Sequence, residues 1–193
     1  ELEADPGAVA AGPRLVGGDG LPELSFGPMM GPLTELRQKV LGRLYDRRWP
    51  AAVRMVSRMT ARRHCPDWVS GACLLVRRAD ALAAGLFDER YFLYAEDVDF
   101  CAALRVTGRH ILFTPEAEIV HLRGACRCTS SGTLMFTLPS GYRPEYDSLF
   151  PVAESPGIYQ QTDWLMVYSD GEVHVAGTTN YTYHLDSVRF APA

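Results

Sequence analysis

The sequence predicts an α/β protein over residues 1–124, followed by a small antiparallel all-β module over residues 133–193. In the first part, strand-like apolar runs alternate with apolar residues at helical spacing, which is typical of α/β layers. From about residue 133 the runs are β-branched and aromatic, with no helical spacing. All five cysteines also lie before residue 129, so the two parts differ in composition. We interpret residues 125–132 as a linker or fusion junction.

Charge and composition limit the class of protein. The chain has 193 residues, enough for one ordinary domain or two small ones, and 47% of them are hydrophobic. Residues 1–128 carry 17 basic and 16 acidic side chains, whereas residues 129–193 carry 2 and 7, giving the overall net charge of −4. An acidic chain without a recognition motif predicts no nucleic-acid partner.

The cysteines and the chain ends suggest a cellular setting. Five cysteines at irregular spacing indicate reduced thiols and a cytoplasmic protein. Cys126 and Cys128 are too close for the usual zinc pair, so we favour incidental thiols over metal binding there. No run reaches the ~18 apolar residues of a membrane span. Because the chain begins with Glu and has no signal peptide, we expect a fragment or a processed chain.

The first elements follow from apolar spacing and turn residues. Residues 8–16 predict a strand with a turn at Gly12-Pro13, and residues 17–32 are rich in glycine and proline and predict a loop. Residues 33–48 have helical spacing, and Pro50 suits the first turn of a second helix.

Residues 37–63 are strongly basic, with nine Lys and Arg and one acidic residue, Asp46. One interpretation is a solvated helix face. The other is attraction to an anionic membrane surface or to a pyrophosphate-linked lipid acceptor, which would place the protein peripherally at the inner membrane face.

The next elements surround a group of acidic residues. Residues 69–76 predict a buried strand, and residues 78–84 predict a short helix that ends at Gly85. Residues 96–106 predict a helix with an acidic first turn, ended by Gly108. Two short strands are expected at 110–114 and 117–121.

The remaining chain predicts strands. Runs at 133–138, 164–168, 172–176 and 181–190 are β-rich, and Asp170-Gly171 is a strong hairpin signal. A module of this size is near the lower limit of independent stability, so we expect it to self-associate. Its Tyr and Trp residues suit either its core or the stacking of glycans.

The acidic group is the first candidate for chemistry. Glu96, Asp97 and Asp99 follow the aromatic run Tyr91–Tyr94, and His121 comes 24 residues after Asp97. Carboxylates that aromatic rings partly desolvate become more basic. The alternative is that the carboxylates only decorate a helix amino terminus and that His121 is structural.

These residues lie within a longer pattern that resembles the second half of the catalytic domain of family 2 glycosyltransferases, above all the rhamnosyltransferase-like members. The matching pieces cover roughly residues 1–124 and are Val9–Leu15, Asp19-Gly20, Trp68–Arg78, Gly85–Glu89, Phe92–Cys101, Gly108, Pro115–Ala117 and His121.

The resemblance implies a partial GT-A-like fold and sugar transfer from a nucleotide-diphosphate sugar to a glycan or lipid-linked acceptor, as in cell-wall or polysaccharide biosynthesis. It implies Asp97 as the general base, flanked by Glu96, and a divalent cation, Mn²⁺ or Mg²⁺, near His121. It also implies substrate contacts at Trp68, Gly71, Ala72 and Asp99. For Trp68 a place in the core is the alternative.

Two features depart from this family pattern. Family members carry an amino-terminal half with a metal-holding Asp-x-Asp, which this sequence lacks, since Asp97-Val98-Asp99 occupies the base position. We therefore expect the chain alone to be inactive. Residues 138–144, Asp170-Gly171 and residues 185–190 instead resemble terminal β modules of phage tail proteins. The alternative function is thus a non-catalytic binding or structural module carried by residues 133–193.

Overall fold

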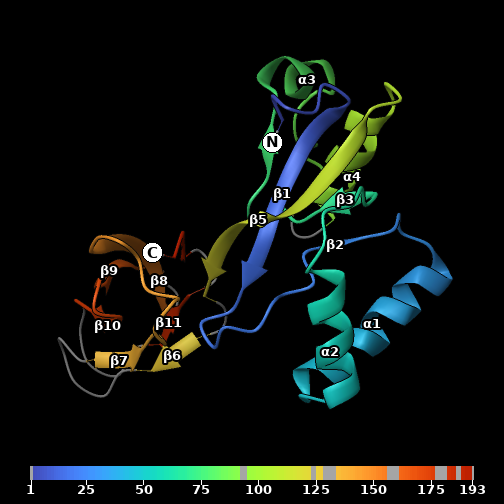
Figure 1. Cartoon of the computed structure of the whole chain (residues 1–193). Helices are drawn as coiled ribbons and strands as arrows, with labels where there is room; N and C mark the ends of the chain where they lie inside the picture. The colour runs from blue at the N-terminus through green and yellow to red at the C-terminus, as the bar shows by residue number, and fades with distance from the viewer. Residues whose placement is uncertain are drawn as a thin grey trace. The chain divides into compact units, whose positions relative to one another are not determined.

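The computed structural model describes residues 2–91, 95–122, 125–127, 134–155, 161–176, 182–185 and 188–192. The chain divides into two compact units, of which the first comprises residues 1–14 and 22–117 and the second residues 15–21 and 118–193 (Figure 1). Part of the predicted linker, Ala125–Arg127, is a strand of the second unit. The predicted domain division at residues 124 and 133 stays a prediction.

The first unit contains helices and strands, which confirms the α/β prediction for this part. Its strands β5, β1 and β4 are neighbours in one sheet, and β2 pairs with β3. The elements in chain order are β1 (Ala8–Val16), β2 (Phe26–Gly27), α1 (Pro32–Asp46), α2 (Pro50–Met59), β3 (Trp68–Val69), β4 (Leu75–Val76), α3 (Arg78–Ala83), α4 (Glu96–Arg105) and β5 (His110–His121).

The helices begin and end close to where local signals predicted. Both α1 and α2 have proline in their first turn, where the missing N–H costs no helical hydrogen bond. Gly85 and Gly108 follow α3 and α4 with φ of +89° and +79°, values that glycine adopts without strain. None of the described helices is long and apolar enough to cross a membrane.

Two predicted breaks within strands are wrong. β1 runs without a turn through Gly12-Pro13, and β5 runs without interruption through Pro115. A Cβ at Gly12 would lie 2.8 Å from Cβ of Val69, so glycine serves here for close packing rather than for a turn. Beyond Pro115, which has no N–H, the Glu116 N–H bonds to Oγ1 of Thr114 at 3.3 Å.

The predicted continuous strand over residues 69–76 is also wrong. β3 ends at Val69, a turn follows, and the short β4 pairs antiparallel with β1. The turn forms because the backbone N–H of Ser70 bonds to the carbonyl of Ser25 at 2.7 Å and the N–H of Cys73 bonds back to Ser70 at 3.3 Å. Leu75 is consequently 61% exposed instead of buried.

The core of the first unit lies between α4 and the strands. In α4 the buried side chains are Val98, Phe100, Cys101 and Leu104, whereas Ala102, which the spacing placed in the core, is half-buried. Phe100 packs against Phe87 with ring centroids 4.6 Å apart. Burial raises the pKa of the Cys101 thiol, which keeps it protonated. The other members of this core are Val9, Ala10, Phe26, Val69, Ile111 and Phe113.

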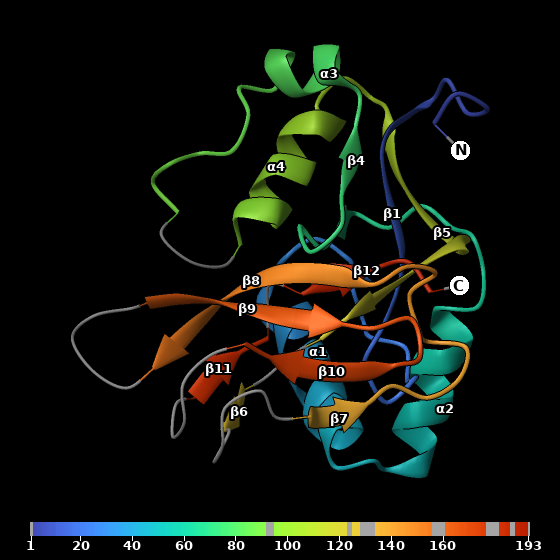
Figure 2. The same cartoon turned by 90° about the vertical axis from the view of Figure 1, so that its left-hand side faces the viewer.

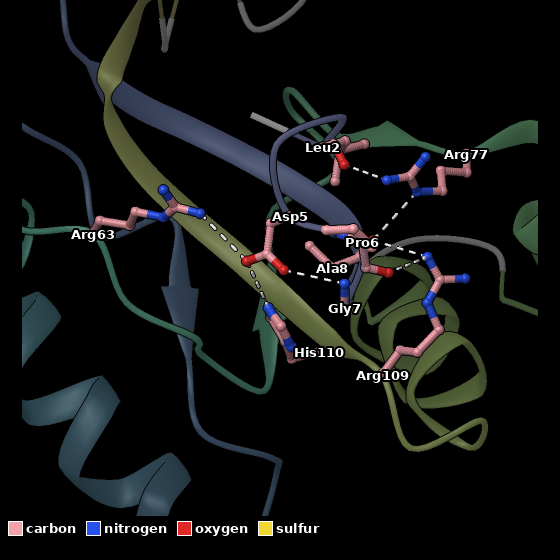
Figure 3. Close-up of polar contacts among 9 residues, drawn as sticks. All are labelled: Leu2, Asp5, Pro6, Gly7, Ala8, Arg63, Arg77, Arg109 and His110. Atoms are coloured by element: carbon pink, nitrogen blue, oxygen red, sulfur yellow. Dashed lines mark hydrogen bonds and ion pairs between the residues drawn. The ribbon is translucent and has the colours of Figure 1, made fainter.

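A polar cluster holds the chain before β1 (Figure 3). The Asp5 carboxylate accepts hydrogen bonds from Gly7 N–H at 3.1 Å, from Nη2 of Arg63 at 3.3 Å and from Nε2 of His110 at 3.1 Å. The guanidinium of Arg77 donates to the carbonyl oxygens of Leu2 and Ala8, and that of Arg109 donates to Pro6 and Ala8. The carbonyl groups of this turn are thus satisfied by side chains from distant elements.

The second unit is built on an antiparallel sheet, as the sequence predicted. Its strand order is β6-β11-β8-β9-β10-β7, and Figure 2 shows β8, β9 and β10 running side by side. The strands are β6 (Ala125–Arg127), β7 (Leu134–Thr137), β8 (Ser148–Ser155), β9 (Gln161–Val167), β10 (Glu172–Val175), β11 (Thr182–His184) and β12 (Arg189–Phe190). β8 was not predicted, because Pro151 interrupts its apolar run.

The hairpin predicted at Asp170-Gly171 is confirmed. It joins the antiparallel strands β9 and β10, and Gly171 has φ of +93°. β12 pairs with Val120 and His121 at the end of β5. The core of this unit contains Val16, Val120, Leu122, Leu138, Val152, Leu165, Val167, Val173, Val175, Tyr183, Leu185, Val188 and Phe190.

The cluster around Asp5 predicts a pH-dependent contribution to stability. Hydrogen bonding from His110 is the main cause that holds the pKa of Asp5 below its ordinary value of 3.8. A depressed carboxyl pKa stabilises the fold fully above pH 3.8, and this stabilisation is lost as pH falls through the lower folded-state pKa. Asp5→Asn should therefore lower Tm at pH 7 by about 1–4 °C, and the difference from wild type should shrink in strong acid.

Thermal unfolding followed by circular dichroism between pH 2 and pH 7 measures this effect. Glu3→Gln is the control, because Glu3 is exposed in the same turn. A Tm difference for Asp5→Asn that does not change with pH would show that charge at Asp5 contributes nothing.

Candidate active site

The candidate site forms at the amino terminus of α4. The helix begins at Glu96 after Ala95, whose φ of +67° is uncommon for a residue other than glycine. Glu96, Asp97 and Asp99 occupy the first turn, where the helix dipole favours negative charge. Most of the aromatic run expected beside these carboxylates, residues 92–94, lies outside the described residues.

Both oxygens of the Asp97 carboxylate accept hydrogen bonds from backbone N–H groups. Oδ1 accepts from Val98 at 2.8 Å, within the first turn of the helix. Oδ2 accepts from Gly71 at 2.9 Å, from the turn after β3. Asp97 therefore does more than decorate the helix terminus, because it joins α4 to a segment 26 residues earlier and holds its own carboxylate in one orientation.

Gly71 and Ala72 lie in this same turn. A Cβ at Gly71 would come within 3.4 Å of Cβ of Asp97, so an alanine would touch Asp97 without a clash. The N–H of Ala72 bonds to Oγ of Ser70 at 3.2 Å. Because Gly71 is exposed, the backbone beside the Asp97 carboxylate is open to a ligand.

Glu96 and Asp99 have different environments. Glu96 is half-buried, and its Oε2 is inaccessible and has no hydrogen-bond partner within the described part of the chain. Asp99 is exposed, and its charge is the main cause that raises the pKa of the Tyr91 hydroxyl. Glu96 and Asp99, which were predicted to share a helix face, therefore differ. Glu96 has a buried oxygen without a hydrogen-bond partner in the described chain, whereas Asp99 is exposed to solvent.

Trp68 is half-buried on β3 and serves the fold in part. Its indole N–H donates to the carbonyl of Pro28 at 2.9 Å. The ring passes over Gly27, where a Cβ would lie 2.9 Å from Cζ2 of the indole. Trp68 therefore packs within the fold on one side, and its exposed part is free to contact a substrate.

His121 belongs to the second unit, whereas the other candidate residues belong to the first. It lies on β5 opposite Arg189 of β12, and it is 8% exposed. Within the part of the chain that the structure describes, no group of three His, Cys, Asp or Glu side chains is arranged to hold a metal ion.

The far end of α4 carries a contact that the sequence did not reveal. Arg105 forms an ion pair with Asp67 at 2.6 Å, and the other Asp67 oxygen accepts from Met29 N–H at 2.7 Å. Asp67 directly precedes Trp68, but nothing in the local sequence indicates a partner 38 residues away on either side.

A pocket of about 430 Å³ was also not predicted. It lies in the first unit, and four short segments between Leu24 and Asp67 form its walls, so no single motif marked it. Its lining consists of Leu24, Phe26, Gly27, Pro28, Thr34, Arg37, Gln38, Leu41, Met55, Met59, His64, Cys65, Pro66 and Asp67.

The chain is similar to proteins named as rhamnosyltransferases. It is 38% identical over 117 residues to the N-acetylglucosaminyl-diphospho-decaprenol L-rhamnosyltransferase of Mycobacterium tuberculosis, in two strains, which covers 60% of this chain and 38% of that protein. It is 36% identical over 55 residues to the rhamnosyltransferase WbbL of Escherichia coli K12, covering 28% of this chain and 21% of that protein. No family model and no solved structure matches.

These similarities support a glycosyltransferase-like chain. The matched part spans less than half the length of each relative, so it represents only a part of such an enzyme.

Proposed function

We propose that this chain forms the second part of the catalytic domain of a family 2, GT-A-like glycosyltransferase. The enzyme would transfer rhamnose or a related sugar from a nucleotide-diphosphate donor to a lipid-linked or glycan acceptor. The observation that carries this proposal is the 38% identity over 117 residues to a protein named as an L-rhamnosyltransferase acting on a diphospho-decaprenol substrate. The geometry of Asp97 supports it.

In this proposal Asp97 is the general base. As the acceptor oxygen forms its bond to the anomeric carbon, the carboxylate takes the hydroxyl proton, and the bond from that carbon to the diphosphate oxygen breaks. A carboxylate has about four lone-pair sites, and two are occupied by the N–H groups of Gly71 and Val98. The remaining two can accept the acceptor hydroxyl while the backbone bonds keep the carboxylate in place.

The neighbouring residues would bind substrate. Glu96 has a buried oxygen without a partner in the described chain, and such atoms usually find one in a ligand or an ordered water. Gly71 and Ala72 offer backbone beside Asp97, and Trp68 and Asp99 flank this surface.

Metal dependence is a further part of the proposal. A bound Mn²⁺ or Mg²⁺ would neutralise the leaving diphosphate, with His121 as one ligand. The described residues do not by themselves form a site of three ligands, so the remaining ligands would come from the donor phosphates and from outside these residues.

The base assignment predicts a loss of activity far larger than any loss of stability. Asp97→Asn retains one side-chain oxygen for the Gly71 N–H, but it cannot take a proton, and it leaves the Val98 N–H without its carboxylate acceptor. We expect transfer to fall by about 10²–10⁴-fold, while the variant still folds with a Tm lowered by about 1–6 °C. The assay uses this chain joined to the amino-terminal half of the mycobacterial relative.

The control for this substitution is Asp46→Asn, because Asp46 is exposed at the end of α1. If the Asp97 variant kept more than half of the wild-type rate, another group would have to be the base.

The ligand role of His121 predicts a metal-dependent effect. His121→Ala should weaken Mn²⁺-dependent donor binding at least about fivefold, beyond any effect on metal-free Tm, because cations in such sites have few protein ligands. Calorimetry of donor binding with and without Mn²⁺ measures this. Equal losses in both conditions would indicate that the buried imidazole only supports the fold.

The same titration distinguishes the transferase from the alternative function. A non-catalytic module carried by residues 133–193 requires no nucleotide-sugar binding in any form of the protein. Self-association through these residues stays a prediction.

We also propose that α1 contacts an anionic membrane surface. Leu33, Leu36 and Val40 are 76%, 59% and 47% exposed and recur at i, i+3 and i+7, so they form one stripe. Exposed Arg37 and Arg43 lie on the two sides of this stripe. An apolar stripe flanked by arginines is typical of helices that lie in the headgroup region.

Membrane binding by α1 should be specific and salt-dependent. We expect the protein to sediment with vesicles of phosphatidylcholine and phosphatidylserine but not with phosphatidylcholine alone, and to dissociate in high salt. Leu36→Glu should weaken vesicle binding about tenfold, because it removes apolar area that the membrane would cover. Leu82→Glu is the matched control, since Leu82 in α3 is 57% exposed. Equal losses in the two variants would exclude α1 as the contact.

A further inference from the structure

The pocket of the first unit has mainly apolar walls from three elements. Leu24 and Phe26 come from β2 and the segment before it, Leu41 comes from α1, and Met55 and Met59 come from α2. Its volume of about 430 Å³ is within the range of roughly 300–1,000 Å³ that small-molecule sites occupy. Methionine side chains adapt to irregular apolar shapes, so these walls suit a branched, flexible chain.

The aromatic wall of the pocket is not arranged to stack a nucleobase. Phe26 is only 3% exposed, and its ring already packs against His64 at 4.5 Å and against Phe113 at 4.4 Å. A planar base therefore finds edge and methyl contacts here rather than a free ring face. This favours an aliphatic ligand over the nucleotide of the donor.

The polar lining adds positive charge. Arg37 is exposed on α1 and has no ion-pair partner among the described side chains, whereas nearby Lys39 is paired with Glu35 at 2.9 Å. Asp67, the acidic residue of the lining, is already engaged by Arg105 and by the Met29 N–H. An anionic group at the rim would therefore meet Arg37 without a competing free carboxylate from the lining.

We infer that this pocket binds the first isoprene units of a polyprenyl diphosphate, with Arg37 contacting the diphosphate. The inference rests on the proposed lipid-linked acceptor and adds the site where its lipid part binds. The pocket combines apolar walls with a nearby positive charge. Such a ligand requires both, since its isoprene units are apolar and its diphosphate is anionic.

The pocket and the proposed membrane stripe occupy adjacent faces of α1. Thr34, Gln38 and Leu41 line the pocket, whereas Leu33, Leu36 and Val40 do not. At 100° per residue, Arg37 lies between these two sets. A lipid whose head is at Arg37 can therefore enter the pocket from a membrane that contacts the neighbouring face.

Titration of the full chain with farnesyl diphosphate tests the inference without vesicles and without a sugar donor. Isothermal calorimetry is done below the concentration at which farnesyl diphosphate forms micelles. We expect saturation at one site, and we expect inorganic pyrophosphate and farnesol to bind at least about tenfold more weakly, since each has only half of the recognised chemistry.

Two pairs of variants locate the site. Met55→Glu and Arg37→Ala should each weaken binding about tenfold or more, the first by placing a charge on an apolar wall and the second by removing the cation. Their matched controls are Met30→Glu and Arg43→Ala. Met30 is 49% exposed and Met55 48%, but only Met55 lines the pocket, and Arg43 is exposed on the same helix as Arg37.

Each outcome decides the inference. Losses confined to Met55→Glu and Arg37→Ala support it. No binding of farnesyl diphosphate, equal losses in the control variants, or displacement of the ligand by a nucleoside diphosphate would overturn it. Because no sugar transfer is measured, a failure of the proposed base Asp97 would leave the binding result unchanged, so the two proposals fail separately.

Discussion

The packing of α4 against β3 is the contact on which the first unit depends, because a charged hydrogen bond or ion pair holds each end of the helix. Asp97 bonds to Gly71 after β3, and Arg105 pairs with Asp67 before it. Asp97 and Arg105 are eight positions apart, which corresponds to about 12 Å along a helix. Asp67 and Gly71 are four positions apart, which corresponds to about 13 Å along an extended chain. The helix and the strand segment thus match in length and run in opposite directions.

The same hydrogen bond from Gly71 orients the carboxylate that we propose as the general base. The carboxylate of Asp97 is oriented by the structure rather than by a ligand, which reduces the reorganisation that a proton transfer would need. The Gly71 backbone N–H holds this carboxylate, and Gly71 remains exposed beside it. Glu96 completes the arrangement with a buried oxygen that lacks a partner in the described chain, which is unusual for a residue that serves only the fold.

The hairpin of α1 and α2 presents a different kind of surface. No residue of α1 is buried, so this helix covers little apolar area within the described chain. A helix with apolar residues on two faces usually has a partner for each. One face lines the pocket at Leu41, and the other carries the exposed stripe that begins at Leu33. Arg37 lies between these faces, and its charge favours anionic lipid as the common partner, both as a surface and as a bound ligand.

The sequence alone determined the elements whose signals act through their own backbone. Proline at the start of α2, glycine after α3 and α4, and the hairpin glycine fix φ or tolerate a missing N–H locally, and all were predicted. The family motif likewise indicated Asp97 as the candidate base. Tertiary structure decided the rest. Gly12 packs against Val69, the Ser70 N–H bonds to the Ser25 carbonyl, and Asp67 pairs with Arg105. No local sequence pattern encodes contacts across such separations. The pocket likewise exists only once four separate segments between Leu24 and Asp67 have packed together.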